Sequence, residues 1–308
     1  MPRAKTANIE LVGLDVGYSH TKIVTGKDGK KVDKFQSTVR LGEIDTNKNS
    51  TVIEFEGKKY TVGEKGRLVM DTKKTFDINF DICIATALAR THDVESLDIN
   101  LVTGLPIGYY QHQKDELKDA LSKKEFKIGY KGKDRTFRIN ECEVFPQSAG
   151  LPIIHPKDFE DKTVLVIDIG GFTVDVSYFE DGDLVSFDTY PLGVLIFRSE
   201  LASAINAKFS TRYDKLDMER VIRNGIIVDE EVIPESEFDI KGFHEQHMQN
   251  ILDHIKADFN YETVESKTFV GGGAIAFKDY LPPNKSIKVD EVYANAKAFY
   301  EVGTQIFG

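Results

Sequence analysis

Two apolar segments of this chain are similar to each other, and each ends in an aspartate that is followed two residues later by a glycine. Residues 12–24 align without a gap with residues 165–177, and Asp15 and Asp168 differ by 153 positions (168 − 15). A glycine lets the backbone turn so tightly that successive amide N–H groups can bind phosphate oxygens. A carboxylate beside such a turn can hold a hydrated Mg²⁺ against the phosphates. One such turn would be ordinary, but two in matching frame predict a phosphate loop on each wall of a cleft.

Both aspartates lie in segments that read as β-hairpins. In each copy an apolar strand ends in Asp-x-Gly, a tight turn and a second strand follow, and a polar turn closes the unit, at residues 27–30 and 180–183. Apolar segments interrupted by glycine-containing turns are the usual signal of a hairpin. We therefore expect two equivalent hairpins, one near the start of each half of the chain.

Size and composition narrow the class of protein. The chain has 308 residues, 41% hydrophobic and 29% charged, which is typical of a soluble protein of about two domains. Its formal charge of −10 argues against direct binding of nucleic acid or of a membrane, so a DNA partner would come through an adaptor. Cys83 and Cys142 lack metal-ligand spacing and are expected as reduced thiols of a cytoplasmic protein. No apolar run has membrane-spanning length, and residues 1–10 lack the core of a signal peptide.

Hydrophobic periodicity predicts the elements that hold the first motif. Residues 31–35 continue as a strand, residues 38–50 read as a polar loop, and residues 51–62 form a third hairpin. A helix, a buried strand, a helix, a hairpin and a short helix then follow, at residues 76–90, 99–106, 109–123, 124–144 and 145–150. Pro146 suits the first turn of that last helix, which would join the two halves.

The second half is expected to repeat this plan. Helices are predicted at residues 193–209, 214–223, 247–259 and 291–307, an acidic solvated loop at residues 229–239, and a strand at residues 268–270. His244 and His247 form an H-x-x-H pair, but without a third close ligand we expect a solvated histidine face. Residues 271–276 also fit a G-x-G-x-x-A dinucleotide fingerprint, which we discount because too few residues follow to complete that fold.

Five motifs in order give the chain a family resemblance. Residues 14–22 are similar to a first phosphate loop and residues 167–175 to a second. Residues 145–149 and 293–300 are similar to the first and second connecting helices, and residues 269–274 to an adenosine motif. Together they resemble the actin-like ATPase superfamily, and most closely the bacterial plasmid-segregation actins of the ParM (StbA) type.

The resemblance implies an α/β, actin-like (ribonuclease H-like) duplicated fold with two lobes around a nucleotide cleft. Lobe I would comprise residues 1–160, with an inserted subdomain at about 36–75, and would be completed by the helix at residues 291–308. Lobe II would comprise residues 161–290, with an insertion at about 195–258.

The resemblance also assigns roles to residues. Asp15 and Asp168 would hold Mg²⁺, mostly through water, and Lys22 would reach a phosphate oxygen, although a solvated strand lysine is the alternative. Residues with backbone near the nucleotide would be Gly17, Tyr18, Ser19, Gly170, Gly171, Phe172, Thr173, Gly271, Gly272 and Gly273. Glu219 and Arg223 lie on a helix that lines the adenosine pocket in this superfamily, but no local motif supports them, and we expect surface residues.

Two positions depart from the best-known plasmid actin. Gln147 would orient the attacking water, where that protein has Glu and eukaryotic actin has Gln; the alternative is a polar residue that faces solvent. A glutamine aligns water but accepts no proton, so hydrolysis could be slow and coupled to assembly. Phe172 replaces a Thr and removes a hydroxyl beside the phosphates.

The resemblance implies a filament-forming protein that binds and hydrolyses Mg²⁺-ATP, with GTP as an alternative. Its polar self-assembly would segregate plasmid DNA through a DNA-bound adaptor of the ParR type, without direct contact with nucleic acid or membrane. The rival interpretation is a non-polymerising phosphotransferase of the same fold, a small-molecule kinase. A chaperone is disfavoured because no peptide-binding segment follows Gly308, and filament strand number, handedness and polarity stay open.

Overall fold

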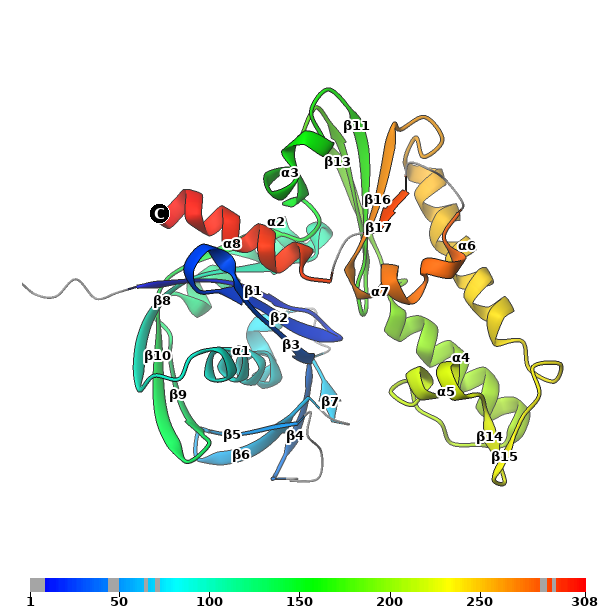
Figure 1. Cartoon of the computed structure of the whole chain (residues 1–308), viewed down its shortest axis with the longest axis horizontal. Helices are drawn as coiled ribbons and strands as arrows, with labels where there is room; N and C mark the ends of the chain where they lie inside the picture. Colours follow the sequence, from blue (N-terminus) through cyan, green and yellow to red (C-terminus); the bar gives the residue numbers. More distant parts are fainter. Residues whose placement is uncertain (1–8, 44–49, 64–65, 70–72, 283–286, 290–291) are drawn as a thin grey trace, which may run out of the picture. The chain divides into compact units, whose positions relative to one another are not determined.

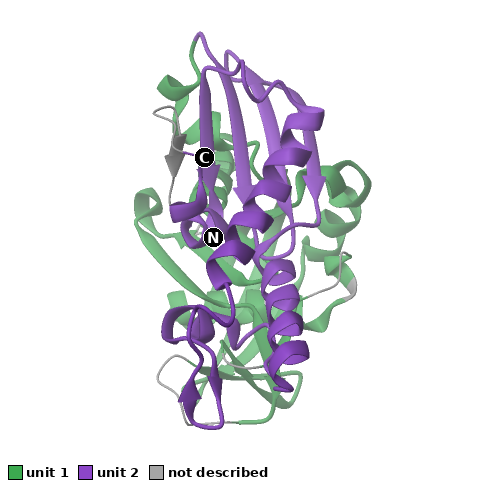
Figure 2. Cartoon of the chain, turned by 90° about the vertical axis from the view of Figure 1, so that its right-hand side faces the viewer, with its two compact units in different colours: residues 1–160, 293–308 green, residues 161–292 purple. Residues whose placement is uncertain are grey.

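The chain forms two compact units in the computed structural model. The structure describes residues 9–43, 50–63, 66–69, 73–282, 287–289 and 292–308. Unit 1 contains residues 1–160 and 293–308, and unit 2 contains residues 161–292 (Figure 2). In the described part of the chain, no helix combines the length and the apolar character that crossing a bilayer requires.

Unit 1 is built on a curled ten-stranded sheet of order β3-β2-β1-β8-β10-β9-β5-β6-β4-β7 (Figure 1). Its strands are β1 (Glu10–Val16), β2 (His20–Thr25), β3 (Lys31–Gln36), β4 (Thr38–Leu41), β5 (Thr51–Phe55), β6 (Lys58–Val62), β7 (Arg67–Leu68), β8 (Ser96–Leu105), β9 (Glu125–Tyr130) and β10 (Lys133–Pro146). Strand β8 pairs in parallel with both β1 and β10. The carboxyl ends of these three strands therefore lie at one edge of the sheet.

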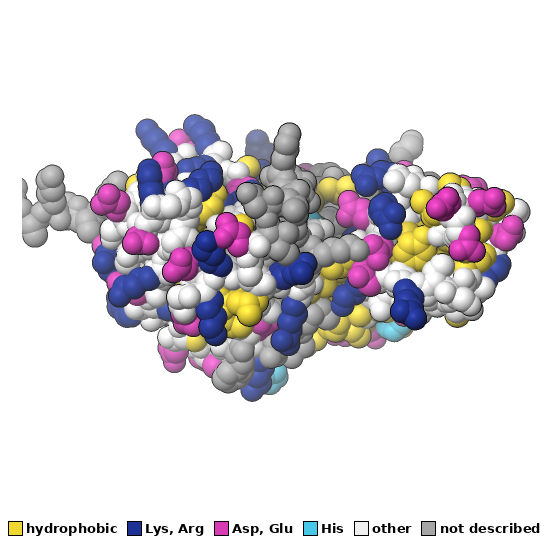
Figure 3. Space-filling model, turned by 90° about the horizontal axis from the view of Figure 1, so that it is seen from below, with side chains coloured by type: hydrophobic (Ala, Val, Ile, Leu, Met, Phe, Trp, Pro, Cys, Tyr) yellow, Lys and Arg dark blue, Asp and Glu magenta, His cyan; other side chains and the backbone are white. Residues whose placement is uncertain are grey.

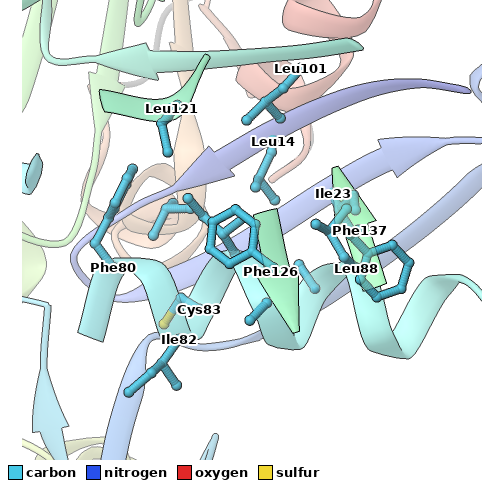
Figure 4. Packing of buried hydrophobic residues seen from close by; sticks show 14 of the residues in the cluster. Leu14, Ile23, Phe80, Ile82, Cys83, Leu88, Leu101, Leu121, Phe126 and Phe137 are labelled. Carbon is cyan, nitrogen blue, oxygen red and sulfur yellow. The ribbon is translucent and has the colours of Figure 1, made fainter. Parts of the chain in front are cut away.

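Helix α1 (Ile78–Thr91) runs inside the curl of this sheet (Figure 1). The Asp77 side chain caps it by accepting from the Asn79 amide at 2.9 Å. The helix is apolar on nearly every side, as expected of a helix enclosed by its own domain. Its Phe80, Ile82 and Leu88 pack with residues of the sheet to form the core of unit 1 (Figure 4).

Two further helices cover unit 1, α2 (Ile107–Leu121) and α8 (Ala294–Phe307). Helix α8 packs on β1 and β8. It approaches so closely that a Cβ on Gly13 would overlap Ala296 O and a Cβ on Gly104 would overlap the Phe299 ring. Glycines at these two positions therefore let the C-terminal helix rest on the strands that carry the first motif.

Unit 2 has a five-stranded sheet of order β13-β12-β11-β16-β17. Its strands are β11 (Thr163–Ile169), β12 (Val174–Glu180), β13 (Asp183–Tyr190), β16 (Ser266–Val270) and β17 (Ile287–Val289), and a small hairpin adds β14 (Ile227–Val228) and β15 (Glu231–Val232). The helices are α4 (Val194–Phe209), α5 (Met218–Asn224), α6 (Ile240–Asp258) and α7 (Gly271–Ala276). The buried cluster of this unit joins sheet residues such as Phe269 to Phe197 of α4 and Ile251 of α6.

The two predicted hairpins are both present and have the same register. Strands β1 and β2 pair antiparallel with Asp15 opposite Lys22, and β11 and β12 pair antiparallel with Asp168 opposite Asp175. The repeat in the sequence is therefore a repeat in the backbone.

Four sequence-based predictions of local structure need correction, and the first is the acidic loop at residues 229–239, which contains strand β15. Part of the predicted loop at residues 38–50 is strand β4, while residues 44–49 lie outside the described residues. Pro146 ends strand β10 instead of starting a helix, and the short helix α3 (Leu151–Ile154) has Pro152 in its first turn. Helix α6 begins at Ile240, seven residues before the predicted start, because Asp239 caps it by accepting from the Gly242 amide at 2.8 Å.

Candidate functional site

The first half-site is centred on Asp15, near the carboxyl end of β1. Its side chain is buried, and both carboxylate oxygens accept hydrogen bonds. Lys22 Nζ donates to Oδ2 at 2.8 Å, and Gln147 Nε2 donates to Oδ1 at 2.9 Å. Lys22 keeps only 14% of its side chain exposed, so the alternative of a solvated strand lysine is wrong. A cation and an amide thus meet on one carboxylate.

The turn that follows Asp15 has a defined geometry. The Gly17 amide donates to His20 O at 3.1 Å, and the Ser37 amide donates to Ser19 O at 2.9 Å. A Cβ on Gly17 would lie 3.0 Å from His20 O and 4.0 Å from Lys22 Nζ. Tyr18 is buried, whereas Ser19 is partly exposed and its hydroxyl is hydrogen-bonded to His20 Nδ1 at 2.9 Å.

Gln147 reaches Asp15 because β10 ends beside β8. The backbone amide of Gln147 donates to Leu105 O at 2.8 Å, which continues the parallel ladder one step beyond β10. The next residue, Ser148, has a φ of 66°, and its amide donates to Asn295 Oδ1 of α8 at 3.0 Å. Gln147 is buried, so the solvent-facing alternative is wrong.

Lys74 also belongs to this half-site, and the sequence analysis missed it. It is 2% exposed, and its Nζ donates to Val16 O at 2.9 Å and to Gly104 O at 3.0 Å. These carbonyls stand at the carboxyl ends of β1 and β8. A lysine in a polar segment carries no periodic signal, so only the three-dimensional structure could reveal it.

The second half-site has the same turn with different side chains. The Gly170 amide donates to Thr173 O at 2.9 Å, in the position of the Gly17 bond to His20. Asp168 is buried, and opposite it Asp175 accepts from Thr173 Oγ1 at 3.2 Å and from Thr189 Oγ1 at 2.6 Å. This half-site therefore places two buried carboxylates across one strand pair.

The first residues of α4 fix the second turn from behind. The amides of Gly193, Val194 and Leu195 donate to the carbonyls of Phe172, Gly170 and Gly171, at 2.9, 3.1 and 2.7 Å. A Cβ on Gly193 would lie 2.5 Å from the Phe172 carbonyl carbon, so glycine is required for this approach. The turn is thus held by three main-chain bonds that do not depend on the identity of residue 172.

The three glycines after β16 form the start of α7 and pack on the end of β11. Gly271 has a φ of 87°, and a Cβ there would overlap Asp168 Oδ1. A Cβ on Gly273 would overlap Ile169 Cγ2, whereas one on Gly272 would meet nothing within 4 Å. The structure therefore brings Gly271 together with Asp168 and leaves Gly272 open on the other side.

His244 and His247 are buried, so the expectation of a solvated histidine face is wrong. His247 Nε2 bonds Leu192 O at 2.9 Å, and its ring stacks on Phe277 with centroids 5.5 Å apart. The His244 ring stacks on Tyr280 with centroids 4.7 Å apart. Burial lowers the pKa of both imidazoles. The pair belongs to the core behind α7.

The donor set fits a hydrated Mg²⁺ better than a directly coordinated one. Among the described residues, no three His, Cys, Asp or Glu side chains gather as a metal cage. Each oxygen of Asp15 accepts one hydrogen bond, from Lys22 or from Gln147, which leaves each an acceptor site for a water of a hydrated cation. Mg²⁺ prefers oxygen ligands and retains several waters when phosphates supply the rest.

Comparison with known proteins shows similarity to actin-like proteins, in sequence for the N-terminal region and in structure for the whole fold. Residues 13–150 match the family described as the N-terminal domain of actin-like proteins. A ParM from Clostridium botulinum, solved as a 15-stranded filament, is 20% identical with a TM-score of 0.82 over 97% of this chain and 99% of its own.

An archaeal actin homologue, Ta0583, is similar to the same extent. It is 23% identical with a TM-score of 0.79 over 96% of this chain and 100% of its own. The structure of the same protein in complex with ADP is 23% identical with a TM-score of 0.74, over 96% of this chain and 99% of that one. Structural similarity at identities of this size shows the fold alone.

Proposed function

Because this chain has the actin-like fold that its motifs predicted, we propose that it is a filament-forming protein that binds and hydrolyses Mg²⁺-ATP. The observation that carries the proposal is the pair of matched hairpins, each with a buried aspartate before a glycine turn. Solved relatives include a ParM filament and an actin homologue in complex with ADP, which supports nucleotide binding and self-association as properties of this fold.

In this proposal the two half-sites bind the phosphates of one nucleotide. Main-chain amides of residues 17–19 and 170–173 bind phosphate oxygens, and Lys22 turns from Asp15 to the phosphates. Asp15 and Asp168 would hold Mg²⁺ through water, and the ion would supply neutralisation of phosphate charge. Gly271 to Gly273 admit the base and ribose side of the nucleotide close to the backbone.

Gln147 positions the attacking water in this scheme. Its amide nitrogen donates to Asp15 Oδ1, so its amide oxygen is the acceptor left to orient a water. A glutamine does not take up the proton of that water, and hydrolysis is therefore expected to be slow. Gln147→Ala should lower the rate of phosphate release roughly 10- to 100-fold at unchanged nucleotide affinity. Unchanged phosphate release in this variant would remove Gln147 from the mechanism.

The proposed biological use is segregation of plasmid DNA in the cytoplasm, through a DNA-bound adaptor of the ParR type. The net charge of −10 supports an adaptor rather than direct contact with DNA. ATP is preferred here to GTP on the resemblance to plasmid-segregation actins. Purified adaptor and DNA should together nucleate filaments of this protein, whereas DNA alone should not.

One experiment tests the core of the proposal. Light scattering, negative-stain microscopy and phosphate release are measured on the pure protein with Mg²⁺-ATP, with Mg²⁺-GTP and without nucleotide. Filaments that depend on nucleotide, with continued phosphate release, support the proposal. A monomer that consumes ATP only when a sugar or a carboxylic acid is added would instead indicate the phosphotransferase.

A further inference from the structure

Strand β13 is exposed to an unusual degree for a strand of a central sheet. All six residues from 183 to 188 are exposed, on both faces of the strand. Three of them are large and apolar: Leu184, Val185 and Phe187. Among the described strands, β13 pairs only with β12, so its outer main-chain edge is open. An open edge with exposed apolar side chains is a template for pairing with another strand.

Strand β3 is the counterpart of β13 in the first repeat. Each is the third strand of its repeat and the outermost strand of its sheet (Figure 1). Val32 of β3 and Val185 of β13 are separated by the repeat offset of 153 (185 − 32), and they are 43% and 55% exposed. Among the described strands, β3 and β13 therefore form two equivalent open edges.

The two edges carry opposite charge. Lys31 and Lys34 lie on β3 and Lys30 directly precedes it, whereas β13 has Asp183 and Asp188 and no Lys, Arg or His. Asp33 of β3 is further neutralised by Arg90, whose Nε and Nη2 donate to its two oxygens at 2.6 and 2.9 Å. On the face of the molecule in Figure 3, side chains of both signs are mixed.

We propose that the β3 edge of one copy pairs with the β13 edge of a second copy, and that this contact builds the filament. Lysines of the first edge meet aspartates of the second, and the main-chain edges complete each other. Pairing of two β13 edges would oppose acidic residues, and pairing of two β3 edges would oppose lysines.

Because the two surfaces differ, the contact is heterologous and need not close into a ring. The proposal of a β3–β13 contact rests on the proposed self-assembly, and it names the surfaces through which two copies meet.

Charge exchange tests the pairing. The variant Lys30→Glu/Lys34→Glu reverses the first edge, Asp183→Lys/Asp188→Lys reverses the second, and a fourfold variant combines all four changes. Lys58→Glu is the matched control, because Lys58 is an exposed lysine on β6, which has neighbours on both sides. Critical concentrations are measured by light scattering and sedimentation with Mg²⁺-ATP. Nucleotide affinity is measured as a control for folding, since none of the five residues belongs to a half-site.

Each doubly substituted variant should raise the critical concentration about tenfold or more, since like charges across an interface cost several kcal/mol. The fourfold variant should return to within about threefold of the control. If the wild type assembles and the reversals have no effect, the pairing is wrong while the proposed function stands. If each reversal blocks assembly but the combination does not restore it, the edges do not meet each other. A wild type that fails to assemble overturns the proposed function and this contact with it.

Discussion

The first and second repeats share a backbone and differ in the residue that lies opposite the aspartate. In both, an aspartate near the strand end is followed by a glycine whose amide bonds the carbonyl three residues on. The residue across the strand pair is Lys22 in the first repeat and Asp175 in the second. The turn is thus present twice, while one repeat has a cation and an amide at its aspartate and the other has a second carboxylate.

Because of this difference, we expect the two half-sites to bind different parts of the ligand. The first offers Lys22 and Gln147 around Asp15, which suits contact with phosphate oxygens and with the attacking water. The second offers Asp168 beside Asp175, whose charge is held by two threonine hydroxyls, which suits a hydrated cation. Variants that change only one of the two repeats test this difference.

The largest effect is expected at Asp168. Asp168→Ala should lower Mg²⁺-dependent hydrolysis by about 10³, the scale of losing one key electrostatic group in an active site. Single-turnover phosphate release measures the loss, and Asp253→Ala on the exposed face of α6 is the control. Turnover at the wild-type rate in Asp168→Ala would falsify the assignment of Asp168 to the cation.

A smaller effect is expected at Lys22, the residue that distinguishes the first repeat. Removing one charged hydrogen bond costs about 1.5–3 kcal/mol, so Lys22→Met should weaken nucleotide binding roughly 10- to 100-fold. Fluorescence titration with a labelled nucleotide reports this change, and Lys58→Met is the control for loss of a lysine. Equal affinity in the two variants would mean that Lys22 only balances the charge of Asp15.

The glycines of α7 give a matched pair within the second repeat. Gly271→Ala places a Cβ over Asp168 Oδ1 at a φ of 87°, which should lower the free energy of unfolding by about 1–3 kcal/mol. Gly272→Ala meets nothing within 4 Å and lies in a helix, so it should be neutral or stabilising by about 0.4–1 kcal/mol. Urea unfolding measures both, and equal destabilisation by the two changes would contradict the packing of α7 on β11.

The sequence predicted these hairpins well because local signals agreed there. Apolar alternation, the Asp-x-Gly turn and the constant offset all assign the same strands, and the structure has them in the expected register. Pro146 misled because proline suits both a helix start and the end of a strand, where no ladder donor is needed. Local chemistry alone did not distinguish the two.

Contacts across long sequence separations could not be predicted in the same way. Gln147 meets Asp15 over 132 positions because β8 lies between β1 and β10 in the sheet. Lys74 reaches two carbonyls of the same strands without any motif. His244 and His247 did carry a signal that was overlooked: they fall in phase with the buried Met248, Ile251 and Ile255 of α6 and so occupy its apolar stripe.

The smallest effect, on the pH dependence of stability, is expected at His244 and His247 in the core behind α7. Burial lowers the pKa of His244 and His247 in the folded state, with Arg198 acting in the same direction on His244 and Glu200 opposing it on His247. The unfolded chain therefore binds more protons in the window below the ordinary histidine pKa. Their stabilising contribution is complete above about pH 6.5 and is lost as the pH falls towards the folded pKa, by up to about 1.4 kcal/mol per pH unit for each histidine.

Thermal unfolding between pH 7.5 and pH 5 should therefore depend less on pH in His247→Phe than in the wild type. Phenylalanine keeps the stacking on Phe277 but has no charge to gain, so the variant loses one proton-linked step even if it is less stable throughout. His112→Phe, at an exposed position of α2, should retain the wild-type pH dependence. If both variants retain it, His247 does not contribute to the acid destabilisation, which must then arise from other groups such as His244 and the carboxylates.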